Sequence, residues 1–414
     1  MICTHIIIAI VAASHLAAHD ASDVRFDKQI ISKEFVADGC TVADFNRDGK
    51  LDIAAGRFIW LGPDFTQQSA YTPERDNPAG INKTPYRADT GYSDYFIEFA
   101  YDFNADGWPD ILVYGLPGTP ASVFVNPGVA LDHVISPAWS RADIFDIANG
   151  ESPDFIDITA DGKPELLCHT NGQFGYAEID WSKPPNSPLA KARFRPITPK
   201  TPEGDKAIFQ YTHGYGAGDI NRDGRTDILT STGWYEQPAD VSQDSNWKLH
   251  GANFGEGGAQ MYAFDVNGAG RNDVITSIKA HGYGLSWFEQ NADGTFAERA
   301  ILGRAAADNA NDAGFSQIHA LRVIDINGDG LLDIVAGKRR WAHGPMGDDE
   351  PMAAPVLCWF ELKRDGNGNA TFTKHLIDAD SGVGTQLWTG DINADAKPDA
   401  VVANKHGVFV FTQK

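Results

Sequence analysis

Residues 325–333 read Asp-Ile-Asn-Gly-Asp-Gly-Leu-Leu-Asp, and this nine-residue pattern returns seven times along the chain. Successive copies begin 58, 55, 62, 46, 60 and 66 residues apart. A repeat of about this size cannot bury its apolar face alone, so the repeats must pack on one another. The copies that keep all four side-chain positions and the glycine begin at Asp44, Asp102, Asp219 and Asp325; partial copies begin at Asp157, Asp265 and Asp391.

The segments between the motifs predict a β-sheet in every repeat. In the fifth repeat, short apolar and β-branched runs alternate with the turn sequences His-Gly-Tyr-Gly and Asn-Ala-Asp-Gly, which favours four antiparallel strands. Seven such sheets around an axis form an all-β, seven-bladed β-propeller, and we predict one such domain over residues 25–414. The four runs of the fifth repeat are Gln260–Phe264, Asp273–Ile278, Leu285–Glu289 and Phe296–Leu302.

The two ends of the chain are predicted to meet. The last repeat reaches Lys414 after only three strands, and Arg25–Ile31 resembles the fourth strand of other repeats. We therefore expect the N-terminal strand to complete the last blade. Residues 1–18 have an apolar centre followed by small residues, as in a secretory signal peptide, which predicts a secreted or periplasmic protein. No later segment could cross a membrane as a helix.

The acidity of the chain is concentrated in the motifs. The formal net charge is −22, from 56 acidic and 34 basic residues. Positions 1, 5 and 9 of the seven motifs hold 20 carboxylates, so 36 acidic residues face 34 basic ones elsewhere. Without a basic stripe, nucleic acid is a poor partner. The oligomeric state is left open.

The spacing of the motif predicts calcium. Oxygens at positions 1, 3 and 5, a backbone carbonyl at position 7 and a carboxylate at position 9 can surround one hard cation. Position 6 is glycine, except for Ala396 in the last copy. For the copies at Asp157 and Asp265, a metal-free turn is an equal alternative. The predicted side-chain ligands are Asp44, Asn46, Asp48, Asp52, Asp102, Asn104, Asp106, Asp110, Asp219, Asn221, Asp223, Asp227, Asp325, Asn327, Asp329, Asp333, Asp391, Asn393, Asp395 and Asp399.

This motif pattern resembles the FG-GAP/VCBS repeat family, which includes the integrin α-subunit propeller. The resemblance covers residues 25–414. It implies that the calcium loops lie on one face of the propeller and have a structural role, and that ligands bind on the opposite face.

Histidines gather on the face opposite the predicted loops. His213 and His319 each precede the first Asp of their motif by six residues, and His281 follows a second strand in the repeat between them. Neutral imidazoles from neighbouring blades could bind zinc or another divalent ion, or one could act as a general base. The alternative for each histidine is a structural hydrogen bond at a strand end.

Other residues of this face suggest carbohydrate chemistry, because aromatic rings and planar polar groups suit sugars. We predict His343 or Tyr283 as the base and Lys338 or Arg339 as groups that orient a substrate. The predicted substrate contacts are Tyr215, Gln260, Gln317, Trp341, Gln386 and Trp388.

The segments around His213, His281, His319 and 338–349 also look like the propeller domain of aldos-2-ulose dehydratases. This weaker resemblance implies dehydration of an oxidised keto-sugar. In our hypothesis, the metal is held by His213, His281 and His319 because these histidines gather on one face. The chain lacks the further domains of the fungal enzyme, which leaves isomerase activity in doubt. The leading hypothesis is a carbon–oxygen lyase or dehydratase. The alternatives are a non-catalytic propeller that binds glycans or proteins, and a polysaccharide lyase, which would want a basic groove.

Overall fold

A computed structural model describes residues 24–73, 86–89, 91–128, 138–202, 208–243, 246–309 and 314–414. The predicted signal peptide, residues 1–18, lies outside these residues. Within them, no helix is long and apolar enough to cross a membrane.

The described chain is almost entirely β-structure, with one short 3₁₀ helix, Ala306–Asn309. Five sheets have four antiparallel strands each, in the order of the sequence except where the chain ends meet. These sheets are β2 (Thr41–Ala43), β3 (Asp52–Ala55), β4 (Phe58–Leu61) and β5 (Gln67–Ala70); β13 (Tyr215–Gly218), β14 (Asp227–Thr230), β15 (Gly233–Glu236) and β16 (Lys248–Gly251); β17 (Tyr262–Phe264), β18 (Asp273–Ser277), β19 (Leu285–Gln290) and β20 (Phe296–Leu302); β21 (Ile318–Ile324), β22 (Asp333–Lys338), β23 (Leu357–Arg364) and β24 (Ala370–Asp378); and β25 (Leu387–Gly390), β26 (Asp399–Asn404), β27 (Gly407–Gln413) and β1 (Phe26–Ser32).

The second and third repeats share a long strand. Residues 140–148 of β9 pair with β8, and residues 149–156 of the same strand pair with β10, so the two repeats join into one seven-stranded sheet. The sequence predicts two separate four-stranded blades here. The structure differs because the single strand β9 serves as the last strand of one repeat and the first strand of the next. The strands are β6 (Ile97–Tyr101), β7 (Asp110–Tyr114), β8 (Thr119–Val125), β9 (Ser140–Ile156), β10 (Glu165–Thr170), β11 (Gln173–Glu178) and β12 (Arg193–Pro196).

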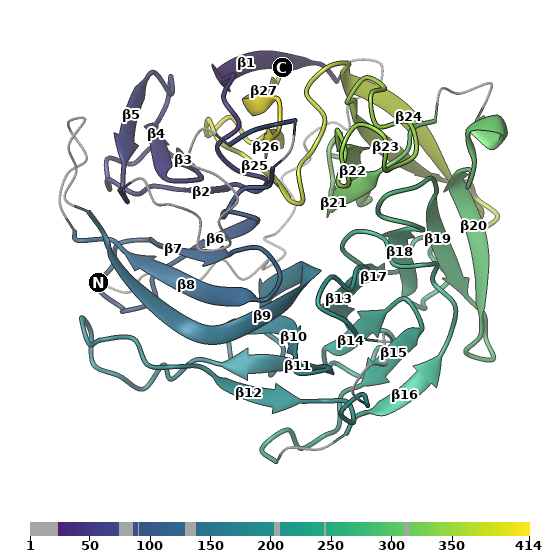
Figure 1. The fold of residues 1–414 in the computed structure, drawn as a ribbon. Coiled ribbons are helices and arrows are strands. Elements are labelled where there is room, and N and C mark those ends of the chain that lie inside the picture. The colour runs from purple at the N-terminus through teal and green to yellow at the C-terminus, as the bar shows by residue number, and fades with distance from the viewer. Residues whose placement is uncertain are drawn as a thin grey trace.

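The sheets stand around a common centre, as in a β-propeller (Figure 1). First strands such as β6, β13, β17 and β21 lie near this centre, and last strands such as β12, β16, β20 and β24 lie at the periphery (Figure 1). The core fills the space between adjacent sheets. For example, Val335 and Trp359 of one sheet pack with Val402 and Phe411 of the next, and all four are buried. The all-β, propeller-like fold is confirmed.

The first and last strands of the described chain pair as predicted. β1 pairs antiparallel with β27, from Phe26 opposite Gln413 to Ser32 opposite Val408. The N-terminal strand therefore completes the sheet of β25–β27 and covers the edge that β27 would otherwise expose.

Each of the seven motifs lies between the first two strands of its repeat. Residues 44–52, for instance, connect the end of β2 to the start of β3, and the same relation holds from 102–110 through 391–399. Because successive strands are antiparallel, the seven loops share one face. The starts of the first strands and the turns between second and third strands lie on the opposite face.

Candidate metal centre

Three histidines and one glutamate converge on the face opposite the motif loops. One ligand atom from each of Glu151, His213, His281 and His319 lies within 4.8 Å of the others. The ring centroids are 4.8 Å apart for His213 and His281, 5.2 Å for His213 and His319, and 5.4 Å for His281 and His319. The structure thus brings together the three predicted histidines. We call these four residues the His–Glu centre.

Three of the four residues occupy the same position of their repeats. Glu151 of β9, His213 before β13 and His319 of β21 each precede the first Asp of their motif by six residues. This shared position in the repeat places the three side chains at the same level along the central axis of the propeller. His281 comes from the turn between β18 and β19 and reaches the cluster from the side.

The side chains of the His–Glu centre are largely enclosed. His319 is fully buried, whereas the side chains of His213 and His281 are 15% and 18% exposed. Glu151 Oε2 lies 3.0 Å from His319 Nε2 and 3.2 Å from His213 Nε2. Nε2 of His281 and Nδ1 of His319 are buried with no hydrogen-bond partner among the described residues. Buried unpaired nitrogens are costly unless another group satisfies them.

The protonation states favour metal binding. Burial lowers the pKa of His281 to about 2 and that of His319 to about 4. Burial alone would raise the pKa of the Glu151 carboxyl, but the neighbouring imidazoles hold it well below its usual range. Metal ligands must be deprotonated, and these three groups are. Three imidazoles and a carboxylate suit zinc and other divalent transition ions, so the residues fit such an ion.

Arg339 links the centre to the first repeat. Its side chain is 1% exposed, Nη1 lies 3.9 Å from Glu151 Oε2, and Nη2 donates to Asp38 Oδ1 at 3.3 Å. The guanidinium also lies over the rings of Tyr92 and Phe96. Asp38 occupies the same six-residue offset before its motif as Glu151.

His343 lies beside the centre and is paired with an acid. Its ring centroid is 4.7 Å from that of His281, and its Nδ1 lies 2.7 Å from Asp348 Oδ1. The side chain of His343 is 61% exposed. Asp348 Oδ2 accepts the backbone N–H groups of Ala342 and His343, which fixes the carboxylate. Nε2 is therefore the ring nitrogen of His343 that can bind a ligand or accept a proton. His281, His343 and Asp348 also form a second group that could hold an ion.

Two other residues predicted to take part in catalysis are held inside the fold. Lys338 is 1% exposed and donates to Ser316 Oγ, and Arg339 is equally buried. Both side chains are therefore enclosed by the protein, and contact of either with a substrate stays a prediction. Tyr283, in the same turn as His281, is 8% exposed, and burial together with Glu350 and Asp349 raises the pKa of its hydroxyl.

The three aromatic residues predicted as substrate contacts pack against the core. Tyr215 is fully buried against Gly150 and Phe174, and Trp341 is 2% exposed and packs against the Lys405 ammonium. Trp388 is partly buried against the core.

Three glutamines predicted as substrate contacts bind backbone groups instead, two of them in other repeats and Gln317 within its own. Gln260 bonds the backbone of Leu321 and Thr385, and Gln386 bonds both backbone groups of Glu98. Gln317 donates to Asp349 O at 2.9 Å. Burial and these partners keep the three side chains from a substrate at the surface.

The exposed aromatic residues of this face lie elsewhere. Phe209 and Tyr211 are 45% and 44% exposed, on a turn that Thr212 closes through hydrogen bonds with Phe209. The turn is tied to the centre, because Glu151 N donates to Thr212 O at 2.9 Å. The exposure of these two rings could not be read from the sequence.

The predicted calcium loops have a common hydrogen-bond pattern. Asp325 Oδ1 and Oδ2 accept backbone N–H groups of the loop, as do the first Asp residues of the other copies. The acidic residue at position 9 also connects the loop to the rest of its sheet. Asp333 is fully buried, and its two oxygens accept N–H groups of Ile326 and Leu362, so it joins the loop to the third strand. Asp52, Asp110, Asp227, Asp273 and Asp399 make the equivalent pair of bonds.

A family model for the FG-GAP-like repeat matches residues 247–336, which span the fifth motif and extend through the sixth. The chain contains FG-GAP-like repeats. No curated protein matches it.

Solved structures with similar folds share little sequence with the chain. A lectin of Agrocybe aegerita that recognises non-reducing terminal N-acetylglucosamine is 15% identical, over 91% of this chain and 87% of that one, with a TM-score of 0.45. BBS1N in its complex with ARL6DN is 10% identical, over 93% and 94%, with a TM-score of 0.48. These values are too low to carry any property of those proteins over to this one.

Proposed function

We propose that this FG-GAP-like propeller is a metal-dependent carbon–oxygen lyase that removes water from an oxidised sugar. The observation that carries the proposal is the convergence of Glu151, His213, His281 and His319, with buried ring nitrogens that lack partners among the described residues. A divalent ion held by these four residues would act as a Lewis acid on a substrate carbonyl oxygen.

His343 is the base in this proposal. Asp348 holds Nδ1 of His343, so Nε2 can take the proton from the carbon next to the carbonyl. The electron pair of that C–H bond forms a carbon–carbon double bond, and the C–O bond at the following carbon breaks. The departing hydroxide takes up the proton from His343 and leaves as water. His319 and Arg339 are buried, so the ion would be held on the enclosed side of the site, while His343 faces the solvent-accessible side.

The test combines metal content with turnover. His213→Ala and His319→Ala should each lose one equivalent of transition metal and the dehydration of aldos-2-uloses, while His250→Ala should keep both. His250 is the matched control because it stacks on Trp234 and pairs with Glu236 away from the centre. Unchanged turnover in the His213 and His319 variants contradicts the proposal.

Metal stoichiometry also tests the role of His343. One transition-metal equivalent per chain supports a base at His343. Two equivalents, one of them lost in Asp348→Asn, would assign His281, His343 and Asp348 to a second ion and remove His343 from the role of base.

A non-catalytic propeller that binds glycans is the second candidate. The observation that favours it is the pair of exposed aromatic rings, Phe209 and Tyr211, on an ordered turn beside the centre. Elemental analysis separates the two: calcium alone supports glycan binding, whereas an added transition ion supports the enzyme.

A further inference from the structure

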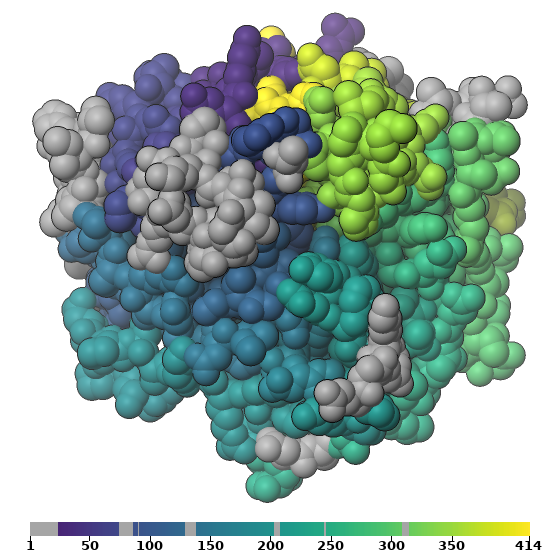
Figure 2. All heavy atoms as spheres, in the orientation of Figure 1, coloured from purple at the N-terminus to yellow at the C-terminus, as the bar shows by residue number. Residues whose placement is uncertain are grey.

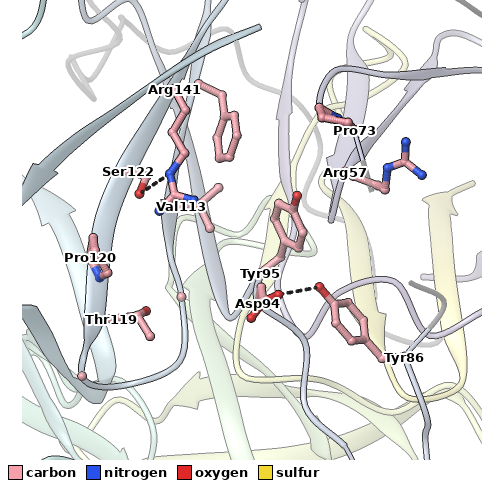
Figure 3. A pocket seen from close by; sticks show the side chains of 13 residues that line it. Arg57, Pro73, Tyr86, Asp94, Tyr95, Val113, Thr119, Pro120, Ser122 and Arg141 are labelled. Atoms are coloured by element: carbon pink, nitrogen blue, oxygen red, sulfur yellow. Dashed lines mark hydrogen bonds between the residues drawn. The ribbon is translucent and has the colours of Figure 1, made fainter. Parts of the chain in front are cut away.

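A cavity lies between two neighbouring sheets, away from the His–Glu centre. It has a volume of about 380 Å³ and lies between the sheet of β2–β5 and the strands β6–β9 (Figure 3). Arg57 follows β3, Thr119 begins β8, and Asp94 precedes β6. These are turns between second and third strands and the start of a first strand, so this part of the lining lies toward the face that carries the His–Glu centre. Ligand pockets commonly have volumes of roughly 300–1,000 Å³.

The two walls of the cavity offer complementary polar groups. Figure 3 shows Asp94 and Tyr95 on one wall and Thr119, Ser122 and Arg141 on the other. The hydroxyl of Tyr86 donates to Asp94 Oδ2 at 3.3 Å. Burial raises the pKa of the Asp94 carboxyl to about 6, although the Tyr86 hydrogen bond and the nearby Arg141 oppose this shift. Among the described residues, the Asp94 carboxylate has the Tyr86 hydroxyl as a hydrogen-bond partner and no salt bridge within 4 Å.

The charges of the cavity nearly cancel. Arg141 is neutralised from its outer side, because its Nε lies 2.7 Å from Asp143 Oδ1. Its Nε also donates to Ser122 Oγ at 3.2 Å, which fixes the guanidinium against the wall. Arg57 is fixed at the rim by a hydrogen bond from Nε to Thr72 O at 3.0 Å. A phosphate or other strong anion would meet the Asp94 carboxylate, so the balance favours a neutral ligand.

Apolar and aromatic side chains complete the lining. Tyr95 and Phe124 are 8% and 4% exposed, and Val113 is 5% exposed, so these groups are rigid parts of the core that face the hollow. A ligand for this cavity must therefore have hydroxyl groups that both donate and accept, and an apolar C–H face for the aromatic rings. Sugars combine these properties, and a pyranose ring is small enough for the volume.

We propose that this cavity is a saccharide-binding site, separate from the His–Glu centre, which holds one neutral sugar residue between Asp94 and Arg141. The inference does not depend on catalysis. Because part of the cavity lining lies toward the face of the His–Glu centre, the cavity can anchor one part of a glycan while another part reaches the axis. The segment that carries Asp94 is tied to the axis, since Tyr95 O accepts the N–H of Asp38 at 3.0 Å.

The experiment is saturation-transfer NMR on the full chain with the methyl glycosides of glucose, galactose, mannose and N-acetylglucosamine at millimolar concentration. At least one glycoside should bind the wild type. Asp94→Asn and Arg141→Gln should each weaken its binding by about tenfold or more, as expected for the loss of a hydrogen bond to a charged group.

Two controls make the result specific. Asp143→Asn removes a charge outside the cavity lining but keeps an oxygen that can accept from Ser122 and Arg141, so binding should change by less than about threefold. His319→Ala should leave glycoside binding unchanged even if it abolishes turnover, which separates this inference from the proposed function. Binding by none of the four glycosides, or binding that His319→Ala removes and Asp94→Asn keeps, would overturn the inference. Thermal unfolding of each variant confirms that it is folded.

Discussion

At the scale of single residues, Glu151 shows that one position of the repeat can have different chemical roles in different repeats. In four repeats, the residue six positions before the first Asp of the motif is Asp38, Glu151, His213 or His319. Asp38 takes up the charge of Arg339, whereas Glu151 meets the two histidines. The same backbone position therefore supplies an ion pair in one repeat and metal-type donors in the others.

Replacing Glu151 tests this distinction. Glu151→Gln should weaken binding of a transition ion by more than the roughly 10–100-fold that outer-shell changes cost, because a ligand is lost. Competition with a chelator of known affinity measures the change. Asp38→Asn, at the equivalent position, should weaken the affinity less, since Asp38 contacts Arg339 and no ligand of the proposed ion. Equal losses in the two variants would contradict a ligand role for Glu151.

Lys405 gives a prediction of pH dependence. Its ammonium lies 4.5–4.7 Å from the ring centroids of Phe35, Tyr92 and Trp341, and burial lowers its pKa from 10.5 to about 8. Between these two values the unfolded chain binds more protons than the folded one, so this group makes stability rise as pH increases above about 8. Urea unfolding across this range should show that rise in the wild type and a smaller one in Lys405→Met. Lys248→Met, at a side chain that is 71% exposed, should keep the wild-type slope.

At the scale of elements, the motif loops combine two functions that mutation can separate. Position 5, as in Asp329, is a predicted calcium ligand on the exposed part of the loop, whereas position 9, as in Asp333, also fixes the loop to β23. The buried carboxylate replaces water for two backbone N–H groups, so the loop depends on it with or without an ion.

Chelation should distinguish the two positions of one loop. Asp333→Ala should lower the free energy of unfolding by about 2–5 kcal/mol both in calcium and in excess chelator, because two backbone N–H groups lose their acceptor. Asp329→Ala should destabilise the protein in calcium and match the wild type closely in chelator. Thermal unfolding under both conditions is the measurement. An Asp329→Ala effect of equal size in chelator would show that no calcium binds this loop.

At the scale of the whole molecule, the pairing of β1 with β27 joins the first and last strands of the propeller. Lys28 at the start of the chain is also paired with Asp378 of β24, at 2.9 Å. Removing β1 would open an edge on which the buried residues Val408 and Val410 lose their cover.

Truncation measures this contribution. A chain that begins at Lys33 should unfold at a lower temperature than one that begins at Val24, and it should self-associate through the open edge of β27. Calorimetry and sedimentation velocity give the two readouts. Equal melting temperatures in the two chains would mean that the pairing contributes little to stability.

The sequence by itself determined the repeat architecture. The motif and the β-branched runs are local patterns, so they predicted the all-β fold, the position of every motif loop between two strands and the pairing of β1 with β27. Regular spacing also placed His213, His281 and His319 on one face. These features follow from residues that are neighbours in the chain or that recur with one period.

Tertiary structure alone decided which side chains reach the surface and which meet. From the sequence, Gln260 and Gln386 could equally be groups that bind a sugar, but in the fold they are buried and bond the backbone of other repeats. Glu151 has the same six-residue offset before its motif as His213 and His319, so the repeat could have indicated it, but only the structure shows that its carboxylate meets their rings. The cavity of Asp94 and Arg141 exists only where two sheets meet. The physical reason is that burial and convergence depend on how sheets pack across the axis, which no local spacing encodes.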